Sequence, residues 1–485
     1  MTKQLRRLSV VVLLMFISLF AATSWIQVAI APELAENPEN RRSLYDSYEV
    51  QRGTIFAGGT AIASSVPSDD VYSWSRTYPD AEMWAPVTGF INPVLRSSTG
   101  LEQAMSAALA GTGSQQFLTR VEQIISGAPA RGSNVLLSLD PDVQKVAFDA
   151  LSGMEGAVVA IQPDSGRILA LATSPSYDTN LLASHNSSQV NAAYQELVDD
   201  PLDPLFNRAI AGDLDPPGST FKLVVTAAAL ASGEYTPEST FDNPAQFRLP
   251  GTDNMLHNFD RGTCGPGEQT TLETALRLSC NIPFAMLALE LGDDAIREQA
   301  EKFGFNSGFE VPLSVTASKY PEGFDEPQTA LSGLGQSDVQ ATPLQIAMVA
   351  AGIANDGVVM NPRMVDRVVA SDLTVQDEPA DSEYGTAMTP EDAETLTQLM
   401  VANVENGAAS GARIDGVDVA GKTGTAEHNP GDPFTLWFTG FAPADNPEVV
   451  VAVMVQNGGG LGQEGTSSGI AAPIAKRVIE AVLSE

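Results

Sequence analysis

The feature that most restricts how this chain can fold is an uncharged segment near its N-terminus, from Leu8 to Pro32. Lys3, Arg6 and Arg7 precede it, and Glu33 is the first acidic residue. At about 1.5 Å per residue, a helix of this length crosses a hydrocarbon core of roughly 30 Å. We therefore expect residues 8–32 to form a transmembrane anchor.

Basic residues beside a membrane span favour a cytoplasmic location. We expect residues 1–7 to form a cytoplasmic tail and everything beyond Pro32 to lie outside the membrane. The alternative is a cleaved signal peptide, with Ala29-Ile30-Ala31 as its small-residue cleavage site. The apolar run is longer than the usual stretch of about 7–15 residues in a signal peptide, which favours the uncleaved anchor.

Composition excludes several classes of function. The net charge is −34, because 26 Lys and Arg stand against 60 Asp and Glu. Such a field repels a phosphate backbone, so we expect no nucleic-acid partner. Two Cys and three widely separated His show no metal-ligand spacing, and we expect no metal or other cofactor. In an exported compartment Cys264 and Cys280 are expected to form a disulfide, and the alternative is two small buried thiols.

The chain beyond the anchor divides into two parts. Residues 33–135 have strand-like pieces broken by Gly and Pro and a weak helical pattern at Phe117–Ile125, and we expect a separate N-terminal domain. Residues 136–485 begin and end with strand-like runs and are mostly helical between them. This order predicts an α+β fold, with one antiparallel sheet built from distant segments and covered by helices. The expected strands are Gly156–Ile161, Arg167–Thr173, Leu436–Phe441 and Val449–Val455, and the expected helices are Asp140–Leu151, most of 220–355 and Ala471–Leu483.

The first motif that carries chemistry is Ser219-Thr220-Phe221-Lys222, at the start of an apolar helical stretch. Residues three apart share one face of a helix. A serine hydroxyl is a weak nucleophile that needs a neighbouring base, and a buried lysine amine can be that base. The backbone N–H groups at such a helix start can stabilise an oxyanion. The alternative is a helix cap with an extended, solvated Lys222.

The second motif is Ser279-Cys280-Asn281, between two apolar helical runs. Its hydroxyl can relay a proton, and its amide can hold a substrate carbonyl. Ser184-His185-Asn186 has the same pattern within a polar loop. We prefer Ser279, because an irregular backbone between two helices needs a reason.

The third motif, Lys422-Thr423-Gly424-Thr425, is expected on an edge strand beside a cleft. Lys422 and the threonine hydroxyls can bind a carboxylate. Gly424 allows a substrate to approach closely. The N–H of Thr425 can complete an oxyanion hole with that of Ser219. The alternative is a surface turn.

In this order the three motifs are those of penicillin-binding proteins and class A β-lactamases. Further segments extend the similarity over nearly the whole chain, and we conclude that it resembles the class B penicillin-binding proteins, the actinobacterial members above all. These segments are Arg52-Gly53-Thr54-Ile55, Gly100-Leu101-Glu102, Phe206-Asn207-Arg208-Ala209, Gly335-Gln336 and Ala341-Thr342-Pro343-Leu344-Gln345. The chain departs from the pattern at Phe56–Gly59, which lacks the usual acidic and basic residues, and at Cys280 inside the second motif.

The resemblance implies a membrane-anchored serine D,D-transpeptidase, with a serine β-lactamase-like domain on an elongated N-terminal domain. Its substrates would be peptidoglycan stem peptides that end in D-Ala-D-Ala, β-lactams would acylate it, and division or elongation membrane proteins would be its partners. Ser219 would be acylated, and Lys222 would take its proton. Ser279 and Lys422 would pass a proton to the leaving amine.

The same resemblance implies a substrate-binding set made of Asn281, Thr423, Gly424 and Thr425. Two other functions remain open. One is a D,D-carboxypeptidase that uses the same residues with water as the acceptor. The other is a non-catalytic scaffold of the cell-wall machinery. We expect His428 to be a surface or packing residue and Trp437 to belong to the sheet core.

Overall fold

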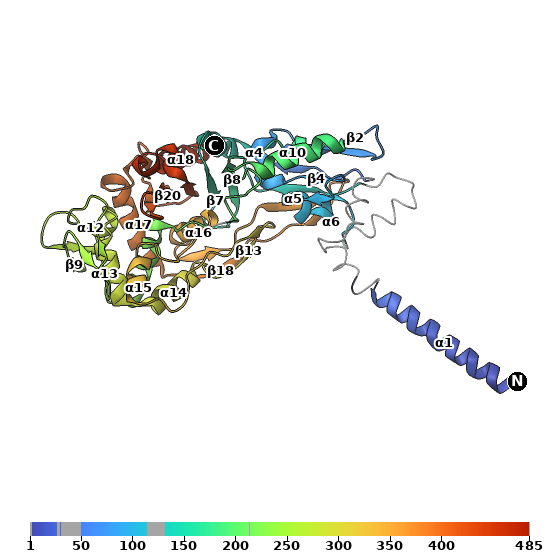
Figure 1. Cartoon of the computed structure of the whole chain (residues 1–485), viewed down its shortest axis with the longest axis horizontal. Coiled ribbons are helices and arrows are strands. Elements are labelled where there is room, and N and C mark those ends of the chain that lie inside the picture. Colours follow the sequence, from blue (N-terminus) through green and yellow to red (C-terminus); the bar gives the residue numbers. More distant parts are fainter. Residues whose placement is uncertain (1, 27–29, 31–49, 114–130, 213, 485) are drawn as a thin grey trace.

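A computed structural model describes residues 2–26, 30, 50–113, 131–212 and 214–484. The long helix α1 (Thr2–Trp25) lies apart from the rest of the molecule (Figure 1). Its segment Lys3–Trp25 has a mean hydropathy of 2.2 and is long enough to cross a membrane. The helix begins at Thr2, ahead of Leu8 where the anchor is expected to start, because residues 3–7 (Lys, Gln, Leu, Arg, Arg) are all good helix formers. The expected helix at 117–125 lies outside the described residues.

A six-stranded sheet forms the end of the body nearest α1 (Figure 1). Its order is β17-β16-β6-β1-β2-β3, so strands from residues 365–377 complete a sheet that begins near residue 55. The predicted border between residues 135 and 136 falls inside β6, and this border stays a prediction. The strands are β1 (Ile55–Ala57), β2 (Thr60–Pro67), β3 (Trp74–Thr77), β6 (Asn134–Leu137), β16 (Val365–Val369) and β17 (Val375–Asp377). Beside them lie α4 (Ala81–Thr88), α5 (Gly100–Ala104), α6 (Ser106–Leu109) and the paired β4 (Ile91–Asn92) and β5 (Ser97–Ser98).

A buried ion cluster holds this end together. Arg52 Nη2 lies 2.9 Å from Glu102 Oε2, and Arg76 Nε lies 2.6 Å from Glu102 Oε1. The carboxylate is fully buried, and the two guanidinium groups hold its pKa below the ordinary value although burial alone raises it. Two segments that the sequence analysis singled out, at Arg52 and at Glu102, therefore contact each other.

The second sheet is antiparallel and has the order β19-β20-β21-β7-β8. Its strands are β7 (Gly156–Ile161), β8 (Ile168–Ser174), β19 (Ala420–Ala426), β20 (Thr435–Ala442) and β21 (Val449–Val455). Every residue of β7, β20 and β21 is buried, because helices cover both faces. Alternate residues serve opposite faces: Val451 and Val453 pack with α8 (Pro141–Ala150) and α18 (Ala471–Leu483), whereas Val450 and Ala452 belong to the core that includes α16 (Pro343–Ala354).

The predicted α+β class and most predicted elements are confirmed. The hairpin of β7 and β8, the strands β20 and β21 and the helix α18 occur where they were expected, and Asp140 caps α8. The remaining helices are α9 (Thr179–Ala183), α10 (Ser187–Asp199), α11 (Lys222–Ser232), α12 (Leu272–Arg277), α13 (Ile282–Leu291), α14 (Asp293–Lys302), α15 (Glu326–Ser332) and α17 (Pro390–Asn406). Short strand pairs are β9 (Thr240–Asp242) with β12 (Gln269–Thr271), β10 (Phe247–Arg248) with β11 (Met255–Leu256), β13 (Phe309–Glu310) with β14 (Ser314–Val315), and β15 (Val358–Met360) with β18 (Glu383–Thr386).

Candidate active site

Ser219 lies in a tight 3-10 turn, Gly218–Phe221, and Lys222 is the first residue of the α11 helix that follows. Residues three apart are aligned in a 3-10 turn, so the two side chains share a face, as the sequence predicted. The turn lies directly against β19. A Cβ placed on Gly218, whose φ is +52°, would come within 2.6 Å of the Thr425 carbonyl oxygen, so this position needs glycine.

The Lys222 amine is fully buried and has three uncharged hydrogen-bond acceptors. Its Nζ donates to the carbonyl oxygens of Ser279 (2.8 Å) and Cys280 (2.9 Å) and to Asn281 Oδ1 (3.0 Å). Burial lowers the pKa of Lys222 well below that of a free lysine, and the charge of Lys422 lowers it further. This environment suits a neutral amine that accepts a proton, and it excludes the solvated lysine of the alternative interpretation.

Ser279 connects the first motif to the third. Its hydroxyl accepts a hydrogen bond of 2.6 Å from Lys422 Nζ, which also donates to the Thr423 carbonyl at 2.8 Å. Lys422 is fully buried, and burial lowers its pKa to about 7. Ser279 has a φ of +58°, a left-handed conformation that is costly for a residue with a side chain. The expected irregular backbone between α12 and α13 is therefore present.

Asn258, which the sequence analysis did not select, holds the Asn281 segment in place. Its Oδ1 accepts from the backbone N–H groups of Asn281 (2.9 Å) and Ile282 (3.1 Å), and its Nδ2 donates to the Gly262 carbonyl. The Asn281 side chain also donates to the His257 carbonyl at 3.1 Å. No local signal in the sequence marks this role, because Asn281 at the start of α13 is itself a residue type that caps helices. Only the structure shows that the Asn281 side chain does not cap α13, so that the first N–H groups of this helix need a distant acceptor.

The structure joins Cys264 and Cys280 by a disulfide, with a Cα–Cα distance of 5.7 Å. Asn243 fixes the far side of this bridge, because its Oδ1 accepts from the Cys264 N–H at 2.6 Å and its Nδ2 donates to the Cys264 carbonyl at 3.2 Å. The second motif is therefore covalently tied to a loop that itself has defined hydrogen bonds.

The third motif lies on β19, at one edge of its sheet, as the sequence predicted. A Cβ on Gly424 would come within 2.8 Å of the Pro217 carbonyl oxygen, so this glycine allows the strand to contact the Ser219 turn. Thr425 Oγ1 lies 3.0 Å from Ser467 Oγ, and Ser467 also donates to the Gly424 carbonyl. Ser467 was missed, although its Gly465–Gly469 segment is a polar run shortly after the last strand.

Other candidates take structural roles. The Asn186 side chain of the rival triplet accepts from Ser188 and Gln189 and so caps α10. The His428 ring lies 3.0 Å from the Thr435 hydroxyl, and Trp437 is fully buried in the sheet.

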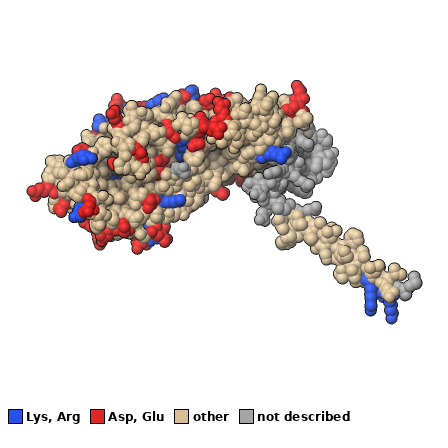
Figure 2. Space-filling model, viewed as in Figure 1, with Lys and Arg blue, Asp and Glu red and all other residues tan. Residues whose placement is uncertain are grey.

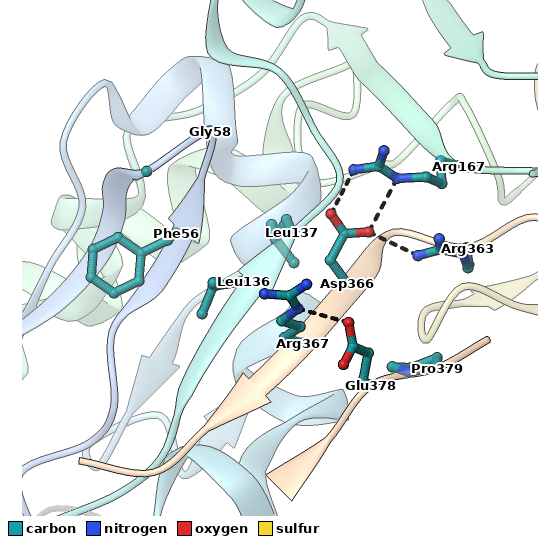
Figure 3. Close-up of a pocket in the computed structure, with 11 residues that line it drawn as sticks. Phe56, Gly58, Leu136, Leu137, Arg167, Arg363, Asp366, Arg367, Glu378 and Pro379 are labelled. Carbon is teal, nitrogen blue, oxygen red and sulfur yellow. Dashed lines mark hydrogen bonds and ion pairs between the residues drawn. The ribbon is translucent and has the colours of Figure 1, made fainter. Parts of the chain in front are cut away.

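A pocket of about 450 Å³ lies on the six-stranded sheet, and its lining includes none of the three motifs (Figure 3). Its Arg167 and Arg363 both pair with Asp366, and its Arg367 pairs with Glu378. Each arginine that lines this pocket therefore has an acidic partner.

Comparison with known proteins now identifies the class. Residues 156–480 match the penicillin-binding protein transpeptidase domain, and residues 52–135 match the penicillin-binding protein A dimerisation domain. The chain belongs to the penicillin-binding protein transpeptidase family, which confirms the resemblance inferred from its motifs.

Within this family the chain is similar to proteins named peptidoglycan D,D-transpeptidase PbpA. It is 40% identical to that of Mycolicibacterium smegmatis, over all of both chains, and 40% identical to that of Mycobacterium tuberculosis, over 100% of this chain and 99% of that protein. The solved structure of penicillin-binding protein A from M. tuberculosis as a ceftriaxone acyl-enzyme matches 90% of this chain and 100% of that chain, with a TM-score of 0.87 and 40% identity. The corresponding penicillin G acyl-enzyme has a TM-score of 0.85 at 40% identity.

Proposed function

We propose that this protein is a serine D,D-transpeptidase that cross-links peptidoglycan stem peptides through an acyl-enzyme on Ser219 and is acylated by β-lactams. The observation that carries the proposal is the buried Lys222 amine, whose three acceptors are uncharged and which follows Ser219 by one turn. The relatives named peptidoglycan D,D-transpeptidase and the β-lactam acyl-enzymes among the similar structures support it.

The proposed reaction begins with proton transfer from Ser219 Oγ to the neutral amine of Lys222. A neutral amine has two N–H bonds and an ammonium has three, so uptake of this proton provides a donor for the third of the three acceptors around Nζ. The serine oxygen then attacks the carbonyl carbon of the penultimate D-Ala. The backbone N–H groups of Ser219 and Thr425 are the proposed donors to the oxyanion.

Collapse of this intermediate breaks the peptide bond to the terminal D-Ala. The leaving amine needs a proton, and the Ser279 hydroxyl, hydrogen-bonded to Lys422, is the proposed route. An amine of a neighbouring stem peptide then attacks the ester carbon and loses a proton, the bond to Ser219 Oγ breaks, and a proton returns to the serine oxygen. Asn281, Thr423, Gly424 and Thr425 are the proposed contacts for the peptide and its terminal carboxylate.

The charges of α1 support a proposed placement in the membrane. Figure 2 shows basic side chains at the free end of this helix, and acidic side chains spread over the body. We infer a cytoplasmic tail (1–7), an anchor (8–32), an N-terminal interaction domain (33–135) and an extracytoplasmic catalytic domain (136–485), because basic flanks stay in the cytoplasm. Membrane proteins of division or elongation are the partners that such a placement favours.

A labelled penicillin tests the proposal. We expect the detergent-solubilised full chain to gain one covalent label, located at Ser219 by mass spectrometry of the modified peptide. The Ser219→Ala variant should gain none, and Ser232→Ala, at the far end of the α11 helix that follows Ser219, should label normally. An unlabelled but folded wild type favours the scaffold alternative. With stem-peptide substrates, cross-linked dimers indicate a transpeptidase, and trimmed monomers indicate a carboxypeptidase.

A further inference from the structure

The side chain of Gln336 pairs with the backbone of Glu427, just beyond the third motif. With its amide turned so that both ends are satisfied, Nε2 donates to the Glu427 carbonyl at 3.1 Å and Oε1 accepts from the Glu427 N–H at 3.1 Å. This two-bond pairing is the one that a neighbouring strand would make. Glu427 directly follows the edge strand β19. The Gln336 side chain therefore pairs with the backbone just beyond the end of this strand, in the place that a neighbouring strand would take.

The backbone around Gln336 is shaped to aim this side chain. Gln336 lies between two residues in left-handed conformations, Gly335 with a φ of +66° and Ser337 with a φ of +64°. Such a conformation is costly for Ser337, which has a Cβ, and strain of this kind persists only where the surroundings enforce it. The segment after α15 is therefore a defined turn rather than a passive connection.

The same turn also contacts the segment that carries the nucleophile. The Gly218 N–H donates to the Gly335 carbonyl at 3.0 Å. A Cβ on Gly335 would come within 2.1 Å of the Gly218 carbonyl oxygen, so no other residue fits there. One short turn thus holds both the backbone beside Ser219 and the end of β19.

The direction of the β19 backbone connects this pairing to catalysis. Residues two apart in a strand direct their N–H and C=O groups to the same side. The groups of Glu427 face Gln336, away from β20, so those of Thr425 face the same free edge. An independent observation agrees, because the Thr425 carbonyl oxygen lies so close to Gly218 that a Cβ there would be 2.6 Å from it.

We propose that Gln336 is a positioning residue for the transpeptidase reaction. By pairing with Glu427, it fixes the free edge of β19 against the Ser219 turn and so holds the Thr425 N–H in place for the oxyanion. This inference rests on the proposed function. Gln336 is not proposed to contact the substrate. It acts by holding β19, and with it the Thr425 N–H, in position.

The test measures how fast labelled penicillin acylates the detergent-solubilised full chain, and how much protein becomes labelled. Removal of one oxyanion donor slows an enzyme about 100- to 1000-fold, so its misplacement in Gln336→Ala should slow acylation by about 10- to 100-fold. Gln336→Glu should be slowed comparably, because a carboxylate accepts from the Glu427 N–H but cannot donate to its carbonyl. Both variants should still become fully labelled and should melt within about 2 °C of wild type, as expected when only a small part of the fold's stability is lost.

Gln340→Ala is the matched control, a glutamine four residues further along whose backbone, rather than its side chain, makes the hydrogen bonds to Lys319. It should be acylated at the wild-type rate. A wild-type rate in Gln336→Ala overturns the inference and leaves the proposed function intact, whereas an unlabelled wild type overturns the proposed function. A smaller labelled fraction with an unchanged rate constant also overturns the inference, because that result reports lost folded protein.

Discussion

Replacement of Lys422 by methionine should abolish acylation and yet stabilise the protein at neutral pH. The Lys422 amine is fully buried, and its hydrogen bonds go to the uncharged Ser279 hydroxyl and Thr423 carbonyl. Burial without a counter-charge lowers its pKa from 10.5 to about 7. Methionine has a similar length and needs no hydration. The substitution therefore removes an unfavourable burial together with a group for which we propose a catalytic role.

The sign and size of the effect follow from proton binding. Between pH 7 and 10.5 the unfolded chain holds the Lys422 proton and the folded chain releases it, so the free energy of unfolding rises with pH in this window and levels off below it. The full change is about 5 kcal/mol, because each pKa unit is worth about 1.4 kcal/mol. The substitution also removes two hydrogen bonds and leaves their acceptors without a donor, which lowers the free energy of unfolding by about 2–3 kcal/mol. Lys422→Met should therefore be about 2 kcal/mol more stable near pH 7 and about 2 kcal/mol less stable near pH 10.

Urea unfolding of the detergent-solubilised full chain at several pH values measures the free energy of unfolding of both proteins and shows whether their order reverses with pH. The comparison is between wild type, Lys422→Met and Lys145→Met, whose lysine side chain is 63% exposed. The surface variant should differ from wild type by less than about 0.5 kcal/mol at every pH. A difference between Lys422→Met and wild type that stays constant from about pH 7 to pH 10 would refute the reasoning, because it would mean that Lys422 does not titrate in the folded protein.

Three further outcomes are expected. Lys222→Ala should stay folded by circular dichroism and lose acylation, and ordinary labelling of this variant would disprove its role as the base. Reduction of the Cys264–Cys280 bridge, verified by alkylation and mass, should slow acylation several-fold, because Cys280 adjoins Ser279 in the loop that binds Lys222; an unchanged rate would contradict this. Asn258→Ala should lose about 1–2 kcal/mol in urea unfolding and acylate more slowly, whereas Asn258→Asp, which keeps the acceptors for two N–H groups, should retain most of the stability.

Local patterns predicted the elements of the catalytic domain well. The strands β20 and β21 are continuous apolar runs, and such runs follow from burial on both faces. The helix α8 has Asp140 as its cap and Pro141 as its first residue, a signal that depends on neighbouring residues alone. Elements whose pattern is set by their own sequence were therefore found close to their observed bounds.

Contacts between distant segments were harder to predict. Asn258 lies in an irregular loop and acts on a helix start 23 residues later, and no periodic pattern marks such a pairing. Ser467 orients Thr425 from the segment after β21, and Gln336 reaches Glu427 from the turn after α15. Each is a polar side chain whose partner is fixed only by tertiary packing. The three motifs themselves were found because each places its reactive residues within four positions of one another.

The polarity around the two buried amines explains how so acidic a chain can keep the proposed base, Lys222, in its neutral form. With 60 acidic residues against 26 basic ones, a carboxylate near either amine would be easy to supply. Yet the acceptors of Lys222 and Lys422 are backbone carbonyls, an amide and a hydroxyl. A carboxylate at that distance would stabilise the ammonium form and raise the pKa of the lysine, leaving no neutral amine to accept the serine proton. Neutral acceptors satisfy the N–H groups without raising the pKa of the lysine. The left-handed backbone at Ser279 directs a carbonyl at Lys222, and this carbonyl suits the proposed proton transfer better than an acidic side chain would.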